Sequence, residues 1–346
     1  MAAHTGAAVS TSALSKRFGR AVALDALTLD VAAGSIFGVI GPNGAGKTTA
    51  LRLLLDIIRP TSGSALVLGV DPRIGGPELR RRIGYLPGEL RLEGRITGRN
   101  LLDQLARISG PVAPGAIDTL AERVGLDLTR QVRTLSKGNK QKLGIVQAFM
   151  HTPDLLVLDE PTSGLDPLVQ QTFLVLVTEA AARGQTVIVS SHVLSEIEQV
   201  ADRVAIMRAG RVVRLSSVQE LRQSAARHVR ATLSGTDVAT VRAALEADGA
   251  LSALSTLSAG LSADSAGISE PLGTGSVCIS GTLNGSIDRL VKLLAGFTVV
   301  DLRIEEPDLE ESVLALYRDD EPGSTREHHR DDHRDGRRTK RHPHES

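Results

Sequence analysis

The chain has 346 residues, a formal net charge of zero and a hydrophobic content of 41%, with 2% aromatic residues and no tryptophan. A chain of this length is expected to form two domains, and with so few aromatic residues their cores must be aliphatic. The zero net charge argues against a nucleic-acid partner that is bound through the overall charge of the protein. A single cysteine, Cys278, excludes an intrachain disulfide and fits a reducing compartment. We find neither a signal-peptide pattern nor a run of about 18 apolar residues, and therefore expect a soluble or peripheral protein.

Residues 9–215 carry alternating strand and helix patterns, which predict an α/β domain. The predicted strands are Leu27–Val31, Ser35–Ile40, Arg82–Leu86, Leu155–Leu158, Thr186–Ser190 and Arg203–Met207. Residues 92–145 instead carry helical patterns, such as Gly98–Ile108 and Pro114–Val124. We interpret this stretch as a helical insert between two halves of the core.

From residue 216 the composition changes, and residues 216–318 predict a small α+β domain with helices on one face of a sheet. Its predicted elements are the strands His228–Leu233, Ser276–Leu283 and Thr298–Ile304 and the helices Val238–Asp248, Ile287–Ala295 and Asp308–Tyr317. The stretch Ala250–Gly275 is rich in Ser, Ala, Gly and Leu and is predicted to be a loosely ordered loop.

The last stretch, residues 319–346, has alternating charges and almost no apolar residues, so we expect it to be disordered. It contains five histidines, which are His328, His329, His333, His342 and His344. A metal site is the alternative reading of these histidines. Solvated, disordered charge is the better interpretation of such a composition.

The run from Gly41 to Thr49 fits the pattern Gly-x-x-x-x-Gly-Lys-Thr, with a predicted strand before it and a leucine-rich helix after it. Its glycines allow the backbone to present N–H groups to phosphate oxygens, and the following helix directs its positive end to the same anion. We expect Lys47 to reach the β- and γ-phosphates of a nucleotide and Thr48 to bind Mg²⁺. A glycine-rich turn with a chance lysine is the alternative. The predicted phosphate-binding residues are Gly41, Pro42, Asn43, Gly44, Ala45, Gly46, Lys47, Thr48 and Thr49.

Two carboxylates, Asp159 and Glu160, follow four apolar residues of a predicted strand. The carboxyl end of such a strand is where open α/β sheets bind their ligands. We expect Asp159 to hold Mg²⁺, directly or through water, and Glu160 to orient or deprotonate the attacking water. A solvated acidic turn is the alternative reading.

Four further motifs surround these two segments. Leu135–Gln141 reads Leu-Ser-Lys-Gly-Asn-Lys-Gln and precedes the acidic strand, and Ser163–Asp166 reads Ser-Gly-Leu-Asp and follows it. His192 comes after a predicted strand, and Phe18 lies in Lys-Arg-Phe-Gly. In order and spacing these features resemble the signature segment, D-loop, switch histidine and adenine-stacking aromatic of ATP-binding cassette (ABC) ATPases, over residues 9–215.

The resemblance implies a P-loop α/β fold with a helical subdomain, and ATP and Mg²⁺ as ligands. It also implies that two ATPase domains pack head to tail around two ATP molecules, as a homodimer or a heterodimer. The residues it adds to the nucleotide site are Phe18, Ser136, Gly138, Asp166 and His192. From the residues alone, Ser136 also reads as a helix cap, His192 as a surface histidine and Phe18 as a core residue.

Two departures from the family pattern stand out. Tyr85-Leu86-Pro87 is followed by Gly88 and Glu89, where the family usually has a glutamine. Gly88 has no side chain to coordinate a metal, and the alternative is that Glu89 supplies the contact through a shift of the loop by one residue. The signature segment is altered at Lys137 and Asn139, and Lys137 adds positive charge beside the expected phosphate site.

The acidic segment Glu305–Val313 and the two variant motifs resemble the ATPase subunits of ABC-2-type drug and antibiotic exporters. This implies ATP hydrolysis that powers a separate permease, with the chain peripheral on the cytoplasmic face of the membrane. We expect the permease to dock near Gly88 and Glu89. One alternative is a soluble ABC ATPase that acts on ribosomes or DNA without a permease. Another is a regulatory subunit with little turnover, suggested by Gly88.

Overall fold

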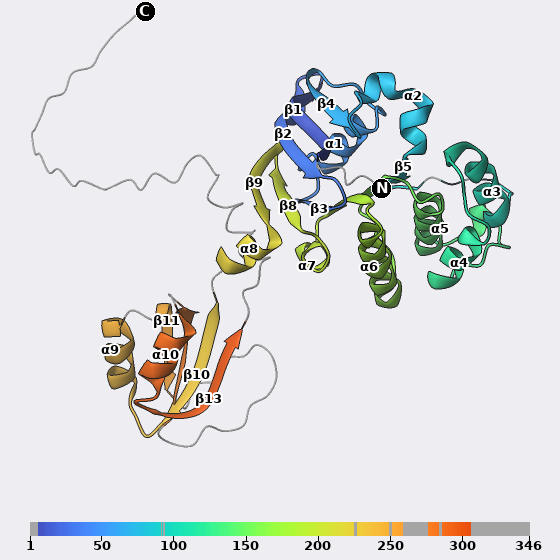
Figure 1. Cartoon of the computed structure of the whole chain (residues 1–346). Coiled ribbons are helices and arrows are strands. Elements are labelled where there is room, and N and C mark those ends of the chain that lie inside the picture. Colours follow the sequence, from blue (N-terminus) through green and yellow to red (C-terminus); the bar gives the residue numbers. More distant parts are fainter. Residues whose placement is uncertain are drawn as a thin grey trace, which may run out of the picture.

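A computed structural model of the chain describes residues 6–90, 92, 94–224, 227–248, 251–258, 276–283 and 286–305. The described residues form a six-stranded sheet, a three-stranded sheet and a four-stranded sheet. The first two sheets share one part of the molecule with helices α1–α7, and the third lies in a separate C-terminal part (Figure 1). No helix within these ranges is both long and apolar enough to cross a lipid bilayer.

The six-stranded sheet has the strand order β5-β6-β7-β3-β8-β9. Its strands are β3 (Ile36–Ile40), β5 (Ile83–Leu86), β6 (Leu155–Asp159), β7 (Thr186–Ser191), β8 (Arg203–Arg208) and β9 (Arg211–Ser217). All neighbours are parallel except β9, which pairs with β8 in the antiparallel direction. Every residue of β3, β6 and β7 is buried, as expected for central strands covered on both faces.

The three-stranded sheet is antiparallel, with the order β2-β1-β4. Its strands are β1 (Ala7–Phe18), β2 (Ala21–Ala32) and β4 (Ser62–Val67). Helix α1 (Lys47–Leu54) contacts β2 and β4 on one side and β6 of the large sheet on the other. Its buried face, which includes Leu51, joins both sheets in one hydrophobic cluster. This packing fixes the helix that follows the phosphate-loop motif.

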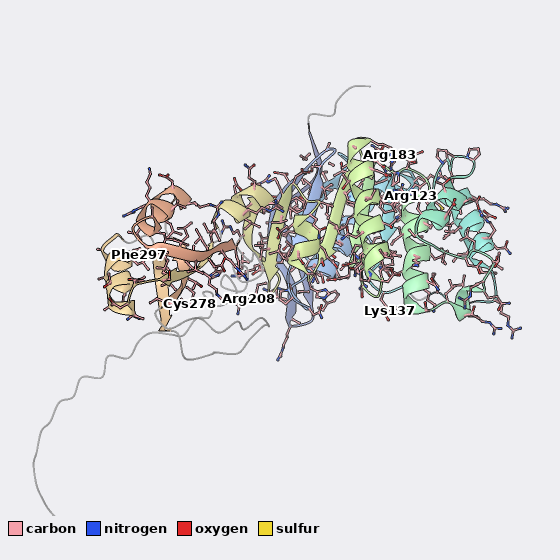
Figure 2. All side chains as sticks on the ribbon, turned by 90° about the horizontal axis from the view of Figure 1, so that it is seen from below. Arg123, Lys137, Arg183, Arg208, Cys278 and Phe297 are labelled. Carbon is pink, nitrogen blue, oxygen red and sulfur yellow. The ribbon has the colours of Figure 1, made fainter. Side chains whose placement is uncertain are left out.

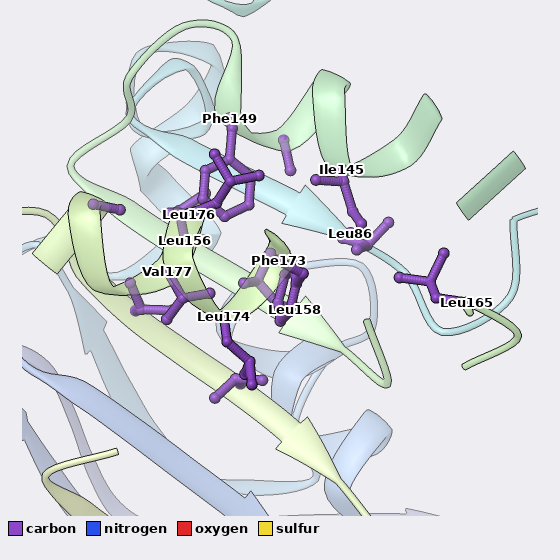
Figure 3. Close-up of a cluster of buried hydrophobic side chains, with 14 of the residues drawn as sticks. Leu86, Ile145, Phe149, Leu156, Leu158, Leu165, Phe173, Leu174, Leu176 and Val177 are labelled. Carbon is purple, nitrogen blue, oxygen red and sulfur yellow. The ribbon is translucent and has the colours of Figure 1, made fainter. Parts of the chain in front are cut away.

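Helices fill the rest of the first part of the molecule. They are α2 (Pro72–Arg81), α3 (Gly98–Ser109), α4 (Ala116–Arg123), a 3-10 turn (Val132–Thr134), α5 (Lys137–Phe149), α6 (Pro167–Ala182) and α7 (Leu194–Glu198). In the second large cluster, side chains of α5 and α6 pack on β5 and β6, and Phe149 meets Phe173 edge to face with ring centroids 6.4 Å apart (Figure 3).

An ion pair also connects the helical insert to α6. Arg123 on α4 and Glu179 on α6 form two bonds of 2.7 and 2.8 Å, in the bidentate geometry that guanidinium and carboxylate favour. Arg183, which directly follows the last residue of α6, has its Nη1 3.8 Å from the same carboxylate. Figure 2 shows Arg123 and Arg183 on the same part of the molecule. The pKa of Glu179 is lowered, mainly by its hydrogen bond with Arg123.

After helix α8 (Val218–Ser224), the C-terminal part has the element order β-α-β-β-α-β. Its elements are β10 (His228–Ser234), α9 (Val238–Asp248), β11 (Leu251–Ser258), β12 (Ser276–Leu283), α10 (Ile287–Leu294) and β13 (Thr298–Glu305). The strand order β11-β12-β10-β13, with antiparallel neighbours throughout, is the ferredoxin-like topology. Alternate β10 residues share one core with Val241, Leu245 and Leu290, so both helices cover the same face.

The predicted α/β class and all predicted strands of the first part are observed, with ends that differ by a few residues. The loop predicted for Ala250–Gly275 is wrong over 251–258, because these residues form β11, which pairs with β12. Unlike residues 259–275, residues 251–258 contain neither Gly nor Pro, so nothing in their composition prevents a strand. The predicted helix Asp308–Tyr317 and the tail 319–346 lie outside the described residues.

Candidate nucleotide-binding site

The phosphate-loop motif connects β3 to α1, as the sequence predicts. Gly46, directly before the helix, has a φ of 101°, and Gly44 has a φ of 82°. Both conformations disfavour a residue with a Cβ atom. A Cβ on Gly46 would also lie 2.7 Å from the carbonyl oxygen of Ala23, so the loop needs glycine there for two reasons. The N-terminus of α1 faces this loop and offers unpaired N–H groups to an anion.

Lys47 is the first residue of α1, and its side chain is 5% exposed. Its ammonium donates hydrogen bonds to the carbonyl oxygens of Gly41, at 2.5 Å, and Pro42, at 3.4 Å. It also forms an ion pair with Glu160, with 3.1 Å between Nζ and Oε1. The Lys47 ammonium is therefore held by carbonyl groups of the phosphate loop, next to the carboxylate that follows strand β6.

Asp159 ends β6 and is buried, and its Oδ1 accepts a 2.6 Å hydrogen bond from the Ser190 hydroxyl. Glu160 follows with a φ of 47°, a left-handed conformation that costs a non-glycine residue energy. Its N–H donates to both the carbonyl and the hydroxyl oxygen of Ser190, each at 3.1 Å. The neighbouring strand β7 thus fixes the backbone that aims the Glu160 carboxylate.

His192 follows β7, and its Nδ1 lies 2.7 Å from Glu160 Oε2. The structure therefore joins Lys47, Glu160 and His192 in one chain of contacts, with Asp159 and Ser190 beneath it. These side chains come from three segments that are far apart in the sequence. They meet because parallel strands place their carboxyl ends along one edge of the sheet.

The donor set at this edge fits Mg²⁺. The Asp159 carboxylate is a hard oxygen ligand, and Thr48 supplies a hydroxyl from the first turn of α1. Gly88, one of the two residues that follow Tyr85-Leu86-Pro87, packs directly on this carboxylate. A Cβ at residue 88 would lie 3.3 Å from Asp159 Oδ2, so the loop approaches the acid through its backbone. Burial raises the pKa of the nearby Tyr85 phenol, and the Asp159 charge raises it further.

The signature segment and the D-loop form a second group. Ser136 caps α5 by accepting a hydrogen bond from the Asn139 N–H at 3.3 Å, as the simpler reading of this serine predicted. Lys137 Nζ donates to Ser163 Oγ at 3.3 Å. A Cβ on Gly138 would lie 2.7 Å from the Gly164 carbonyl oxygen, so these two backbones touch.

Two more predicted residues occupy defined positions. Asp166 caps α6 by accepting a 3.0 Å hydrogen bond from the Val169 N–H. Phe18 ends β1 and is 53% exposed, so the reading of Phe18 as a core residue is wrong. Lys16 Nζ lies 4.9 Å from the centroid of its ring. Because the side chain is exposed, it offers an aromatic surface of the kind that stacks on a base.

Sequence reasoning missed two residues of this region, Ser190 and Gln141. Ser190 ends a predicted strand at the ligand edge, which is a signal that could have identified it. Gln141 is 3% exposed, and its amide donates to the carbonyl oxygens of Glu160, at 3.3 Å, and Pro161, at 2.9 Å. In the sequence, Gln141 is marked by its place at the end of the Leu135–Gln141 motif and by its polar side chain among apolar helix residues.

Comparison with known proteins decides the family. The family model for ABC transporters matches residues 24–163. The bacitracin transport ATP-binding protein BcrA of Bacillus licheniformis is 37% identical over 236 residues, which cover 67% of this chain and 77% of that protein. The chain belongs to the ABC transporter ATP-binding proteins. The predicted family and the ABC ATPase fold are thereby confirmed, and ATP is the ligand of this ATPase.

Other relatives agree. The daunorubicin/doxorubicin resistance ATP-binding protein DrrA of Streptomyces peucetius is 36% identical, and the match covers 63% of this ABC ATPase and 67% of DrrA. An uncharacterized ABC transporter ATP-binding protein of Nostoc is 40% identical, and the match spans 62% of its length, which is less than two thirds. A solved ATP-binding subunit of an ABC transporter is 29% identical, with a TM-score of 0.58 over 62% of this chain and 92% of that one. The dimeric cassette MJ0796, bound to ADP and Pi, is 21% identical, has a TM-score of 0.55 and shares the fold.

Proposed function

We propose that this ABC ATPase hydrolyses ATP to power a separate membrane permease, which exports a drug, an antibiotic or another hydrophobic compound. The contact chain Lys47–Glu160–His192 at the phosphate loop carries the hydrolytic part of the proposal. The export part is supported by BcrA and DrrA, whose names refer to bacitracin transport and to daunorubicin/doxorubicin resistance. Both names concern the relatives, and their transfer to this chain is our inference.

In this proposal the loop N–H groups and Lys47 bind the ATP phosphates, and Phe18 stacks on adenine. Thr48 and Asp159 would hold Mg²⁺, which would supply positive charge against the phosphates when bound. Glu160 orients the attacking water and accepts its proton, since a carboxylate at this position can only accept hydrogen bonds. His192 contacts the γ-phosphate. The Glu160 contacts with Lys47 and His192 support these roles, because they place base, cation and histidine within one site.

We further propose that two copies, or this chain and a second ATPase chain, sandwich two ATP molecules. Ser136, Gly138 and Asp166 would then contact the nucleotide of the partner. The support is that the signature segment and the D-loop pack on each other and together present a helix N-terminus. A shared site of this kind produces a two-fold, isologous assembly.

The permease would hold the protein on the cytoplasmic face of the membrane. We place its docking surface near Gly88 and Glu89, because the backbone at Gly88 packs on the Asp159 carboxylate. A change at the nucleotide site would reach a docked permease through this contact. The proposed domain limits are 9–215 for the ATPase domain and 216–318 for the accessory domain. The contacts that join Lys47, Glu160 and His192 at the phosphate loop support turnover over the low-turnover alternative.

Fractionation of cells with and without the gene for the permease tests this proposal. We expect the ATPase in the membrane fraction only when the permease is present. Equal recovery in membranes without the permease would contradict the proposal. A ribosome-bound fraction would instead support a soluble ABC ATPase that acts without a permease.

A further inference from the structure

The buried amide of Gln141 connects the signature helix to the acidic strand end. Gln141 lies on α5, five residues after Ser136, which is about 8 Å along the helix axis. Its Nε2 donates to the carbonyl oxygens of Glu160 and Pro161, at 3.3 and 2.9 Å. Because the side chain is 3% exposed, water cannot readily replace these bonds.

The backbone that Gln141 holds is strained and needs support. Glu160 has a φ of 47°, and such conformations persist only where the surroundings impose them. Strand β7 holds the N–H side of Glu160 through Ser190, and Gln141 holds its carbonyl side. The direction of the Glu160 carboxylate therefore depends on two elements, one of which is the signature helix.

We propose that Gln141 is a positioning residue that couples the two ATP sites of the assembly. The inference rests on the proposed function, in which Ser136 at the start of α5 meets the partner's ATP and Glu160 acts on this chain's own ATP. Since α5 is one rigid helix, a shift of its N-terminus toward the partner's phosphates moves the Gln141 amide, and with it the Glu160 carbonyl. Engagement of one ATP thus sets the geometry of the base at the other.

The test compares Gln141→Met, which keeps the length of the side chain but removes the donor, with Gln147→Met, the same change on a half-buried residue of the same helix. We expect Gln141→Met to lower kcat by about 10- to 100-fold with little change in KM, and to lower the Hill coefficient for ATP toward one. Gln147→Met should leave all three near wild type. Gln141→His places an N–H at a similar reach and should recover most of the lost kcat.

A second readout does not depend on turnover. Hydrogen exchange of the peptide over residues 160–166 should be faster in Gln141→Met than in Gln147→Met, while exchange in β6 stays the same. If Gln141→Met fails to fold, Gln141→Asn, which withdraws the amide by one methylene, replaces it in both measurements. Unchanged exchange together with kcat within twofold of wild type would overturn the role of Gln141. If Gln141 has no positioning role but the proposed function is correct, Glu160→Gln is still inactive. If the proposed function is wrong, Glu160→Gln keeps its full activity.

Discussion

Glu160 and His192 form a direct contact of 2.7 Å between Oε2 and Nδ1. Since an ionised carboxylate only accepts hydrogen bonds, the tautomer that satisfies this contact carries its hydrogen on Nδ1. The same carboxylate binds Lys47 through its other oxygen. Glu160 therefore orients the histidine and the lysine together, and its charge is central to the site.

The first prediction concerns Glu160→Gln. The change keeps the size of the side chain but removes the proton acceptor, so we expect kcat to fall by about 100- to 10,000-fold while MgATP still binds. Lys47→Ala should instead weaken nucleotide binding itself, because it removes the loop's cation. Phosphate release and nucleotide titration measure the two effects. A Glu160→Gln protein with near wild-type ATPase activity would refute the assignment of the base.

The second prediction concerns association. We expect Glu160→Gln to gain mass in light scattering when MgATP is added, because bound ATP joins two chains and is not hydrolysed. Adding Gly138→Ala should weaken this association but leave ATP binding to the single chain intact, because its Cβ would lie 2.7 Å from the Gly164 carbonyl oxygen. Absence of any mass increase at saturating ATP would exclude the homodimer and favour a second ATPase chain.

The sequence predicts much of this site because its main features are local. The phosphate loop and the end of β6 each lie in one short segment, and glycine spacing or an apolar run followed by acids marks them directly. That these segments meet follows from the rule for parallel strand ends. The roles of Glu160, His192 and the signature residues remain predictions, because geometry in a single chain does not show them acting on ATP.

The missed features depend on tertiary contacts. Gln141 donates to a loop that lies about 20 positions further along the chain, and the residues around it on α5 do not indicate this contact. The sequence predicts a loop over β11 because the whole stretch 250–275 is rich in Ser, Ala, Gly and Leu, and this composition gives no sign of the pairing between β11 and β12. The sequence predicts no role for Ser190, because a serine at a strand end is informative only once Asp159 and Glu160 are known to contact it.

The third prediction concerns Ser190→Ala. The hydroxyl donates to Asp159 and accepts from the Glu160 N–H, and the residue is fully buried, so its removal should destabilise the fold by about 1–3 kcal/mol. We also expect a higher Mg²⁺ requirement and a lower kcat, since both acids lose a partner. Ser191→Ala, which affects Glu196 instead, is the matched control. Equal kinetics in the two variants would show that Ser190 contributes only to stability.

The last prediction concerns Arg123 and Glu179, which tie the helical insert to α6. These side chains are 32% and 39% exposed, so solvent screens the pair, and we expect Arg123→Met to cost only about 0.2–1 kcal/mol at neutral pH. The hydrogen bond with Arg123 lowers the pKa of Glu179. A lowered carboxyl pKa stabilises the fold above the unfolded-state value of about 4.3, and this contribution is lost as the pH falls through the folded-state value.

The stability difference between wild type and Arg123→Met should therefore be constant from about pH 6 to 8 and shrink below about pH 4. Urea unfolding at several pH values measures it, provided both proteins unfold in a single transition. Arg183→Met is the control, because Arg183 is 3.8 Å from the same carboxylate and lacks the bidentate geometry, so its smaller effect should follow the same pH dependence. A difference that stays the same below about pH 4 would mean that Arg123 acts through packing of its aliphatic stem rather than through the Glu179 charge.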